Sequence, residues 1–172
     1  MKIEDIKIAF ARKKLLKLSS GAVEKNRWRR MGVILEAEED ELLNSFFQLK
    51  EDLKFADEDI QIIISRKRGL KSDIFEYPSV SIQDLNWKGS ISDEASAFVN
   101  SAYEVLISFT AEENKMADFL VEVSRANLKV GRKKADEKGI FDLNISAELS
   151  EPEIFTTELK KYLQILNTGI TT

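Results

Sequence analysis

Residues 31–65 read MGVILEAEEDELLNSFFQLKEDLKFADEDIQIIIS and carry a complete strand–helix–strand pattern. The apolar run MGVIL at 31–35 and the β-branched run IQIII at 60–64 are typical of buried strands. Between them, apolar residues recur every three or four positions, which predicts an amphipathic helix over residues 38–53. The side chains that define its apolar face are Leu42, Phe46, Leu49 and Leu53. Two strands joined by a helix in this way favour a parallel pair with a crossover connection.

The rest of the chain continues to alternate strands with helices. Further strands are predicted at residues 75–82, 103–109, 128–132 and 140–146. Pro78 makes the first of these an edge strand or an irregular segment, because proline cannot donate to a sheet. Further helices are predicted at residues 92–102, after a capping box at 110–113, and after a second capping box at 150–153. We therefore expect one three-layer, Rossmann-like α/β domain over residues 31–172, with a mostly parallel sheet covered on both faces.

The first thirty residues differ from the rest in charge. They hold ten Lys and Arg but only three acids, a net charge of +7, whereas residues 31–172 carry −11. Residues 2–18 have apolar side chains at helical spacing, so we expect a basic helical arm over residues 1–30. Clustered cations interleaved with aromatic side chains are suited to tracking a phosphate backbone. The residues predicted to bind a polyanion are Arg12, Lys13, Lys14, Lys17, Arg27, Trp28, Arg29 and Arg30.

A basic segment alone does not identify its partner. RNA is one candidate, which would make the protein part of a ribonucleoprotein. The arm could instead pack on the acidic body of its own chain, or on a second copy to give a homodimer. An amphipathic basic helix can also lie on a membrane surface or bind an acidic protein. The sequence leaves these alternatives open.

The composition excludes several classes of enzyme. The chain contains no His and no Cys, so Ser-His-Asp and Cys-His catalysis and thiolate- or His-ligated zinc sites are impossible. It also lacks the glycine patterns of dinucleotide-binding and P-loop proteins. We therefore expect a non-enzymatic binding protein without a catalytic residue set, metal or cofactor. No signal peptide and no apolar stretch long enough to span a membrane are recognisable, so a cytoplasmic location is expected.

A second group of cations follows the predicted strands. Parallel α/β sheets bind ligands outside the carboxyl ends of their strands, and helix N-termini there favour anions. Two basic turns at these ends therefore predict a rim that could bind a phosphate or a sugar nucleotide, although charge runs are more often solvated turns. The rim residues are Arg66, Lys67, Arg68, Thr110, Arg132 and Lys133.

Several segments of the chain resemble a known family. DEDIQIIISRKRG at 57–69, DLNWKG at 84–89 and KVG at 129–131 are similar to a family of short, uncharacterised α/β proteins of Bacteroidota. The resemblance covers nearly the whole chain and implies a fold and a source, but no activity. Residues 103–132 also resemble, locally, a strand–helix–strand unit in the N-terminal half of heptosyltransferase-type glycosyltransferases. Those enzymes bind the nucleotide sugar with a second Rossmann-like domain, which this chain is too short to contain.

Overall fold

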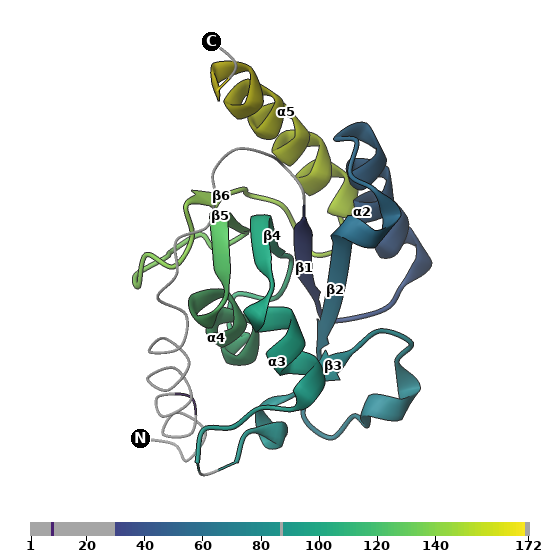
Figure 1. Cartoon of the computed structure of the whole chain (residues 1–172), viewed down its shortest axis with the longest axis vertical. Helices are drawn as coiled ribbons and strands as arrows, with labels where there is room; N and C mark the ends of the chain where they lie inside the picture. Colours follow the sequence, from purple (N-terminus) through teal and green to yellow (C-terminus); the bar gives the residue numbers. More distant parts are fainter. Residues whose placement is uncertain (1–7, 9–29, 87, 171–172) are drawn as a thin grey trace.

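The computed structural model describes Ile8, residues 30–86 and residues 88–170, without the side chains of 166–170 (Figure 1). The strands are β1 (Met31–Leu35), β2 (Ile60–Ser65), β3 (Ser79–Val80), β4 (Ala102–Ser108), β5 (Arg125–Gly131) and β6 (Leu143–Asn144). The helices are α2 (Asp40–Asp52), α3 (Asp93–Asn100), α4 (Lys115–Val123) and α5 (Pro152–Ile170). Short 3-10 turns occupy Asp57–Asp59, Ser72–Ile74 and Ile82–Asp84.

The six strands form one sheet in the order β3-β2-β1-β4-β5-β6, and every pair is parallel. Met31, the first residue of β1, lies opposite Ile60 of β2 on one side and Val105 of β4 on the other. This is the strand order of doubly wound, Rossmann-type sheets. The predicted α/β class and Rossmann-like architecture are therefore confirmed.

Helices cover both faces of the sheet. On one face, Ile34 and Ile63 pack in a cluster with side chains of α3 and α4. On the other, Val33 and Ile64 pack with side chains of α2 and α5. Neighbouring residues of a strand thus point into opposite cores, which explains why the strands read as continuous apolar runs.

Aromatic rings join the sheet to the α2–α5 layer. The centroid of the Phe109 ring lies 5.8 Å from that of Phe46 on α2 and 5.0 Å from that of Phe155 on α5. All three side chains are almost fully buried. Such tilted aromatic contacts stabilise a core beyond the burial of their area. They fix the two helices to the same side of the sheet.

Two predictions about local structure were wrong. The strand expected at residues 140–146 is reduced to the two residues of β6, because only Val130 and Gly131 of β5 pair with it. The capping box expected at residues 110–113 does not begin a helix. Residues 111–114 form a turn closed by the Asn114 N–H and the Ala111 carbonyl at 3.1 Å, and α4 begins only after Asn114.

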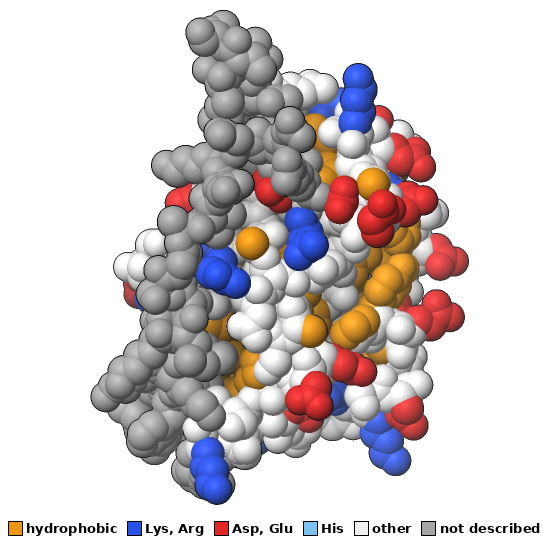
Figure 2. Space-filling model, in the orientation of Figure 1, with side chains coloured by type: hydrophobic (Ala, Val, Ile, Leu, Met, Phe, Trp, Pro, Cys, Tyr) orange, Lys and Arg blue, Asp and Glu red, His pale blue; other side chains and the backbone are white. Residues whose placement is uncertain are grey.

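The surface around α2 is acidic. Asp40 and Glu41 lie in the first turn of this helix, and three acids fill the 3-10 turn Asp57–Asp59 that follows it. Figure 2 shows acidic side chains spread along this side of the molecule. This part of the body is therefore unsuited to contact with phosphates.

Candidate functional site

The strand order places a crevice at the carboxyl edge of the sheet. The chain leaves β1 towards β2 and leaves β4 towards β5, so its connections diverge between two neighbouring strands. In open α/β sheets, ligands bind at such a switch point. The residues that follow β1 and β4 are therefore the first to consider as a site.

The carboxylate of Glu36, directly after β1, bridges this crevice. Its Oε1 accepts hydrogen bonds from the Ala111 backbone N–H at 2.8 Å and the Asn114 amide nitrogen at 2.7 Å. The Asn114 side-chain oxygen in turn accepts from the Ala117 N–H at 2.8 Å, which caps α4, and from the Ser65 hydroxyl at 3.1 Å. One network of polar groups thus connects the ends of β1 and β2 to the start of α4.

Arg66, directly after β2, is held by its own loop. Its side chain is only 7% exposed and forms an ion pair with Asp84 through Nη2. Nη1 donates to the Leu70 carbonyl at 2.6 Å. The remaining donor, Nε, is buried and has no hydrogen-bond acceptor within the described residues. Arg66 therefore organises residues 66–84 and retains one unused donor.

Arg132, directly after β5, joins three segments. Its Nε donates to the Ala147 carbonyl at 2.9 Å and its Nη1 to the Thr110 carbonyl at 2.8 Å. The Thr110 hydroxyl hydrogen-bonds with that of Ser108 at 3.0 Å, so this side chain is also engaged internally. Arg132 and Thr110 thus hold the ends of β4 and β5 and the segment before α5 together.

Lys133 is engaged with α4 and the turn before it. Its Nζ lies 3.1 Å from a carboxylate oxygen of Asp118 and donates to the Glu112 carbonyl. Burial raises the pKa of Asp118 above its ordinary value, and the nearby Lys133 ammonium opposes that shift. The pair is therefore a partly buried structural ion pair.

A cleft of about 480 Å³ opens at the same edge of the sheet, and we call it the strand-end cleft. Its charged lining consists of Glu36, Arg66, Lys67, Arg68, Glu113 and Lys115. Its apolar lining consists of Ile82, Ala111, Met116 and Leu149. The volume is in the range of small-molecule sites, and cations outnumber acids in its lining.

The structure separates the six predicted rim residues into two groups of three. The residues that line the strand-end cleft are Arg66, Lys67 and Arg68. The residues that lie at the ends of β4 and β5, outside the lining of the cleft, are Thr110, Arg132 and Lys133. All six residues follow strands at the carboxyl edge of the parallel sheet. Their binding to an anion stays a prediction.

Most residues of the cleft, Glu36, Asn114 and Lys115 among them, were not predicted as site residues. Glu36 could have been identified from its position directly after an apolar strand. Asn114 and Lys115 were hidden by the apparent capping box at residues 110–113, since the helix starts further along. Glu36 and Asn114 are joined across the cleft by a hydrogen bond between residues 78 positions apart in sequence, a contact that no local pattern indicates.

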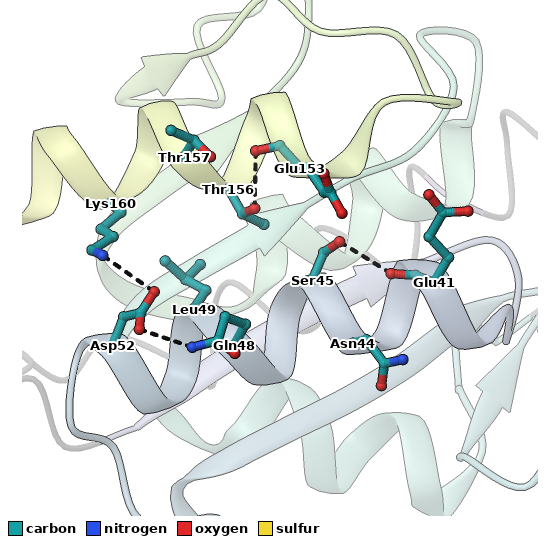
Figure 3. Close-up of a pocket in the computed structure, with 10 residues that line it drawn as sticks. All are labelled: Glu41, Asn44, Ser45, Gln48, Leu49, Asp52, Glu153, Thr156, Thr157 and Lys160. Atoms are coloured by element: carbon teal, nitrogen blue, oxygen red, sulfur yellow. Dashed lines mark hydrogen bonds and ion pairs between the residues drawn. The ribbon is translucent and has the colours of Figure 1, made fainter.

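A second hollow, of about 640 Å³, lies between α2 and α5 (Figure 3). Its lining is polar, and much of it is hydrogen-bonded within the protein. Lys160 of α5 lies 3.3 Å from Asp52 of α2, and Gln48 donates to the same carboxylate at 3.0 Å. These two partners, Gln48 foremost, lower the pKa of Asp52. The Ser45 hydroxyl donates to the Glu41 carbonyl one turn earlier.

The predicted arm is described at two positions. Ile8 is helical and only 6% exposed, and it packs in the cluster on the α3–α4 face. The Arg30 backbone N–H donates to the buried carboxylate of Glu104. The predicted polyanion-binding residues that lie outside the described residues are Arg12, Lys13, Lys14, Lys17, Arg27, Trp28 and Arg29.

Two further features are absent from the part of the chain that the structure describes. No group of three or more acidic side chains there is arranged to hold a metal ion. No helix in that part combines the length and the apolar character needed to cross a bilayer.

Comparison with known proteins agrees with the resemblance to an uncharacterised family. Searches of curated proteins and of solved structures give no significant match. One family model, described as a family of unknown function (DUF6913), matches residues 7–166. Because this match covers most of the chain, the protein belongs to that family.

Proposed function

We propose that this protein is a non-enzymatic binding protein whose basic arm, residues 1–30, contacts RNA or another polyanion. The observation that carries the proposal is the charge division, +7 in the arm against −11 in the remainder. Cations that neutralise phosphates release counterions, which gives affinity without sequence specificity. The acidic body repels phosphates, so the contact would be confined to the arm. A role within a cytoplasmic ribonucleoprotein is consistent with these properties.

The contacts of the described cations support the arm as the binding element. Arg66, Arg132 and Lys133 are engaged with acceptors of their own chain, and releasing them would break those bonds. The basic turns of the body thus offer fewer cations to a large polyanion than their sequence suggests. The likeness of residues 103–132 to glycosyltransferases stays a prediction and carries no part of this proposal.

The burial of Ile8 determines how the arm should be tested. Removing residues 1–30 would also remove a side chain from the core cluster on the α3–α4 face. Loss of binding could then reflect a damaged fold. Charge substitutions that keep Ile8 avoid this. A suitable arm variant replaces Arg12, Lys13, Lys14 and Lys17 with Gln.

The measurement is the affinity for a labelled single-stranded RNA as a function of salt concentration. Each lost phosphate contact should reduce the slope of log K against log salt by about 0.7, so the arm variant should lose up to about 3. A control variant removes the same charge from exposed positions of the body. Its substitutions to Gln are at Lys71, Lys88, Lys134 and Lys161.

Two results would contradict the proposal. One is full-length protein without salt-dependent RNA affinity, and the other is an equal loss of slope in the arm and body variants. Light scattering on the same samples tests one of the alternatives, the homodimer. A dimer that becomes monomeric only in the arm variant, without RNA affinity in either protein, would indicate a homodimer joined through the arm.

A further inference from the structure

Helix α5 carries exposed apolar side chains on a side that is not packed in the core. Three of the six large apolar side chains that are exposed among the described residues belong to this helix. Ile154 is 48% exposed, Tyr162 45% and Ile165 67%, whereas Phe155 and Leu159 of the same helix are buried. Figure 1 shows the C-terminal half of α5 extending beyond the sheet, where a second molecule could reach it. Exposed apolar side chains gathered on one element mark an interaction surface.

Two charged residues complete this surface, which we call the α5 stripe. It consists of Ile154, Glu158, Lys161 and Ile165, spaced by four, three and four residues, so all four side chains share one face of the helix. The side chains of Glu158 and Lys161 are 43% and 63% exposed, and Nζ of the Lys lies 3.1 Å from Oε1 of the Glu. None of the four lines the hollow between α2 and α5, so the stripe faces away from α2.

The α5 stripe is complementary to itself in the antiparallel direction. Its spacing of four, three and four residues is the same when read from either end. An antiparallel second copy therefore places the partner's Ile165 opposite Ile154 and the partner's Lys161 opposite Glu158. A parallel copy would instead place like charges opposite each other at both charged positions, which is repulsive. The charge pattern thus favours a second copy of this chain and favours one direction of pairing.

We propose that this protein forms an antiparallel homodimer in which the α5 stripes of two copies face each other. The same surface of both copies is used, as in other interfaces with two-fold symmetry. The Ile contacts provide affinity, and the Glu–Lys pairs select the direction. Because one helix of each copy makes the contact, the interface is small, and we expect a dissociation constant of about 10–100 μM. The proposal is independent of RNA binding and differs from a dimer joined through the arm, since no residue of the stripe belongs to residues 1–30.

Sedimentation equilibrium of the full chain, over about 1–500 μM, measures the dissociation constant of the dimer. Glu158→Lys and Lys161→Glu should each raise it at least about tenfold, because two attractive pairs become repulsive. Glu153→Lys is the matched control, since it reverses an exposed charge of the same helix that lies in the hollow with α2, and it should change the constant less than about twofold. The arm variant described above keeps the whole stripe and should remain dimeric.

An equimolar mixture of the two charge-reversal variants separates the interface from effects within one helix. Each variant has like charges three residues apart in its own helix, and mixing does not change this. In a mixed dimer, however, one copy carries two Lys and the other two Glu at these positions. The mixture should therefore dimerise within about threefold of wild type, although each variant alone is largely monomeric.

Ile165→Asp tests the apolar contact. It should abolish the dimer at about 500 μM without lowering the stability of the monomer to urea, because Ile165 is 67% exposed. The proposal is overturned if the wild-type chain is monomeric at about 500 μM or if the charge reversals dimerise as well as Glu153→Lys. It is also overturned if the mixture of the two reversals stays monomeric, or if the arm variant does not dimerise.

Discussion

Replacing Arg132 with Met tests whether this side chain is a structural connection rather than an anion-binding group. The guanidinium donates to the Ala147 carbonyl at 2.9 Å and the Thr110 carbonyl at 2.8 Å. Its central carbon also lies 5.9 Å from the centre of the Phe109 ring. Met would remove both hydrogen bonds and keep part of the apolar contact with the ring.

The expected loss of stability follows from these contacts. A hydrogen bond from a charged donor contributes about 1.5–3 kcal/mol, and a partly exposed cation–π contact about 0.5–1 kcal/mol. Arg132 is half-buried, and its two hydrogen bonds are made by one side chain, so the contributions are not fully additive. We expect Arg132→Met to lower the free energy of unfolding by about 2–4 kcal/mol, a large fraction of the stability of a typical domain.

Urea denaturation followed by far-UV circular dichroism measures this loss. Lys134→Met is the control, because it removes a positive charge from the same turn at an exposed position and should change stability by less than about 0.5 kcal/mol. Arg132→Lys keeps the charge but cannot donate in two directions from a planar group, so it should recover less than half of the loss. If Arg132→Met is as stable as Lys134→Met, the structural role assigned to Arg132 is wrong, and the side chain would be available to an anion.

Gly32, Asn114 and Lys129 each test a different kind of contact by urea denaturation. In Gly32→Ala the new Cβ would lie 2.8 Å from Leu106 Cδ1 and 2.9 Å from Tyr103 Cε1. Overpacking should outweigh the about 0.5–1 kcal/mol that Ala gains over Gly in a strand, leaving a net loss of about 1–2 kcal/mol. A variant as stable as wild type would contradict this. Asn114→Ala removes the cap of α4 and should cost about 1–2 kcal/mol, whereas Asn114→Ser should lose less because Ser can cap. Burial lowers the pKa of Lys129 below its ordinary value of 10.5, so the unfolded chain binds more protons between the two values and wild-type stability should rise with pH there. Lys129→Met should lack this rise, and parallel pH profiles of the two proteins would contradict the assignment.

The sequence predicted the layers of this fold because burial on both faces leaves a simple pattern. The central strands read as apolar runs, and the helices between them show one apolar stripe each, so element type and order could be derived without tertiary information. The edge strands could not be predicted as well. β6 is short because only the last two residues of β5 pair with it, and that pairing is a long-range property.

The candidate site was predictable in location but not in chemistry. Parallel strands end at one edge, so the cations after β2 and β5 could be placed there from the sequence. Their partners could not, because Asp84 and Ala147 are distant in sequence from Arg66 and Arg132. The start of α4 was missed for the same reason. Residues 110–113 have a local capping pattern, but residues 111–114 form a turn that contacts Glu36 instead of the first turn of a helix.

The segment that follows β1 differs from that of dinucleotide-binding Rossmann-type proteins. Such proteins place a glycine-rich turn there, and its free N–H groups bind a pyrophosphate. Here Glu36 accepts from the Ala111 N–H, and Glu38 accepts from the Tyr77 N–H at 2.7 Å. Glu36 thus occupies a backbone donor at the switch point between β1 and β4, and Glu38 occupies one just before β3. Both carboxylates would repel a phosphate placed beside them.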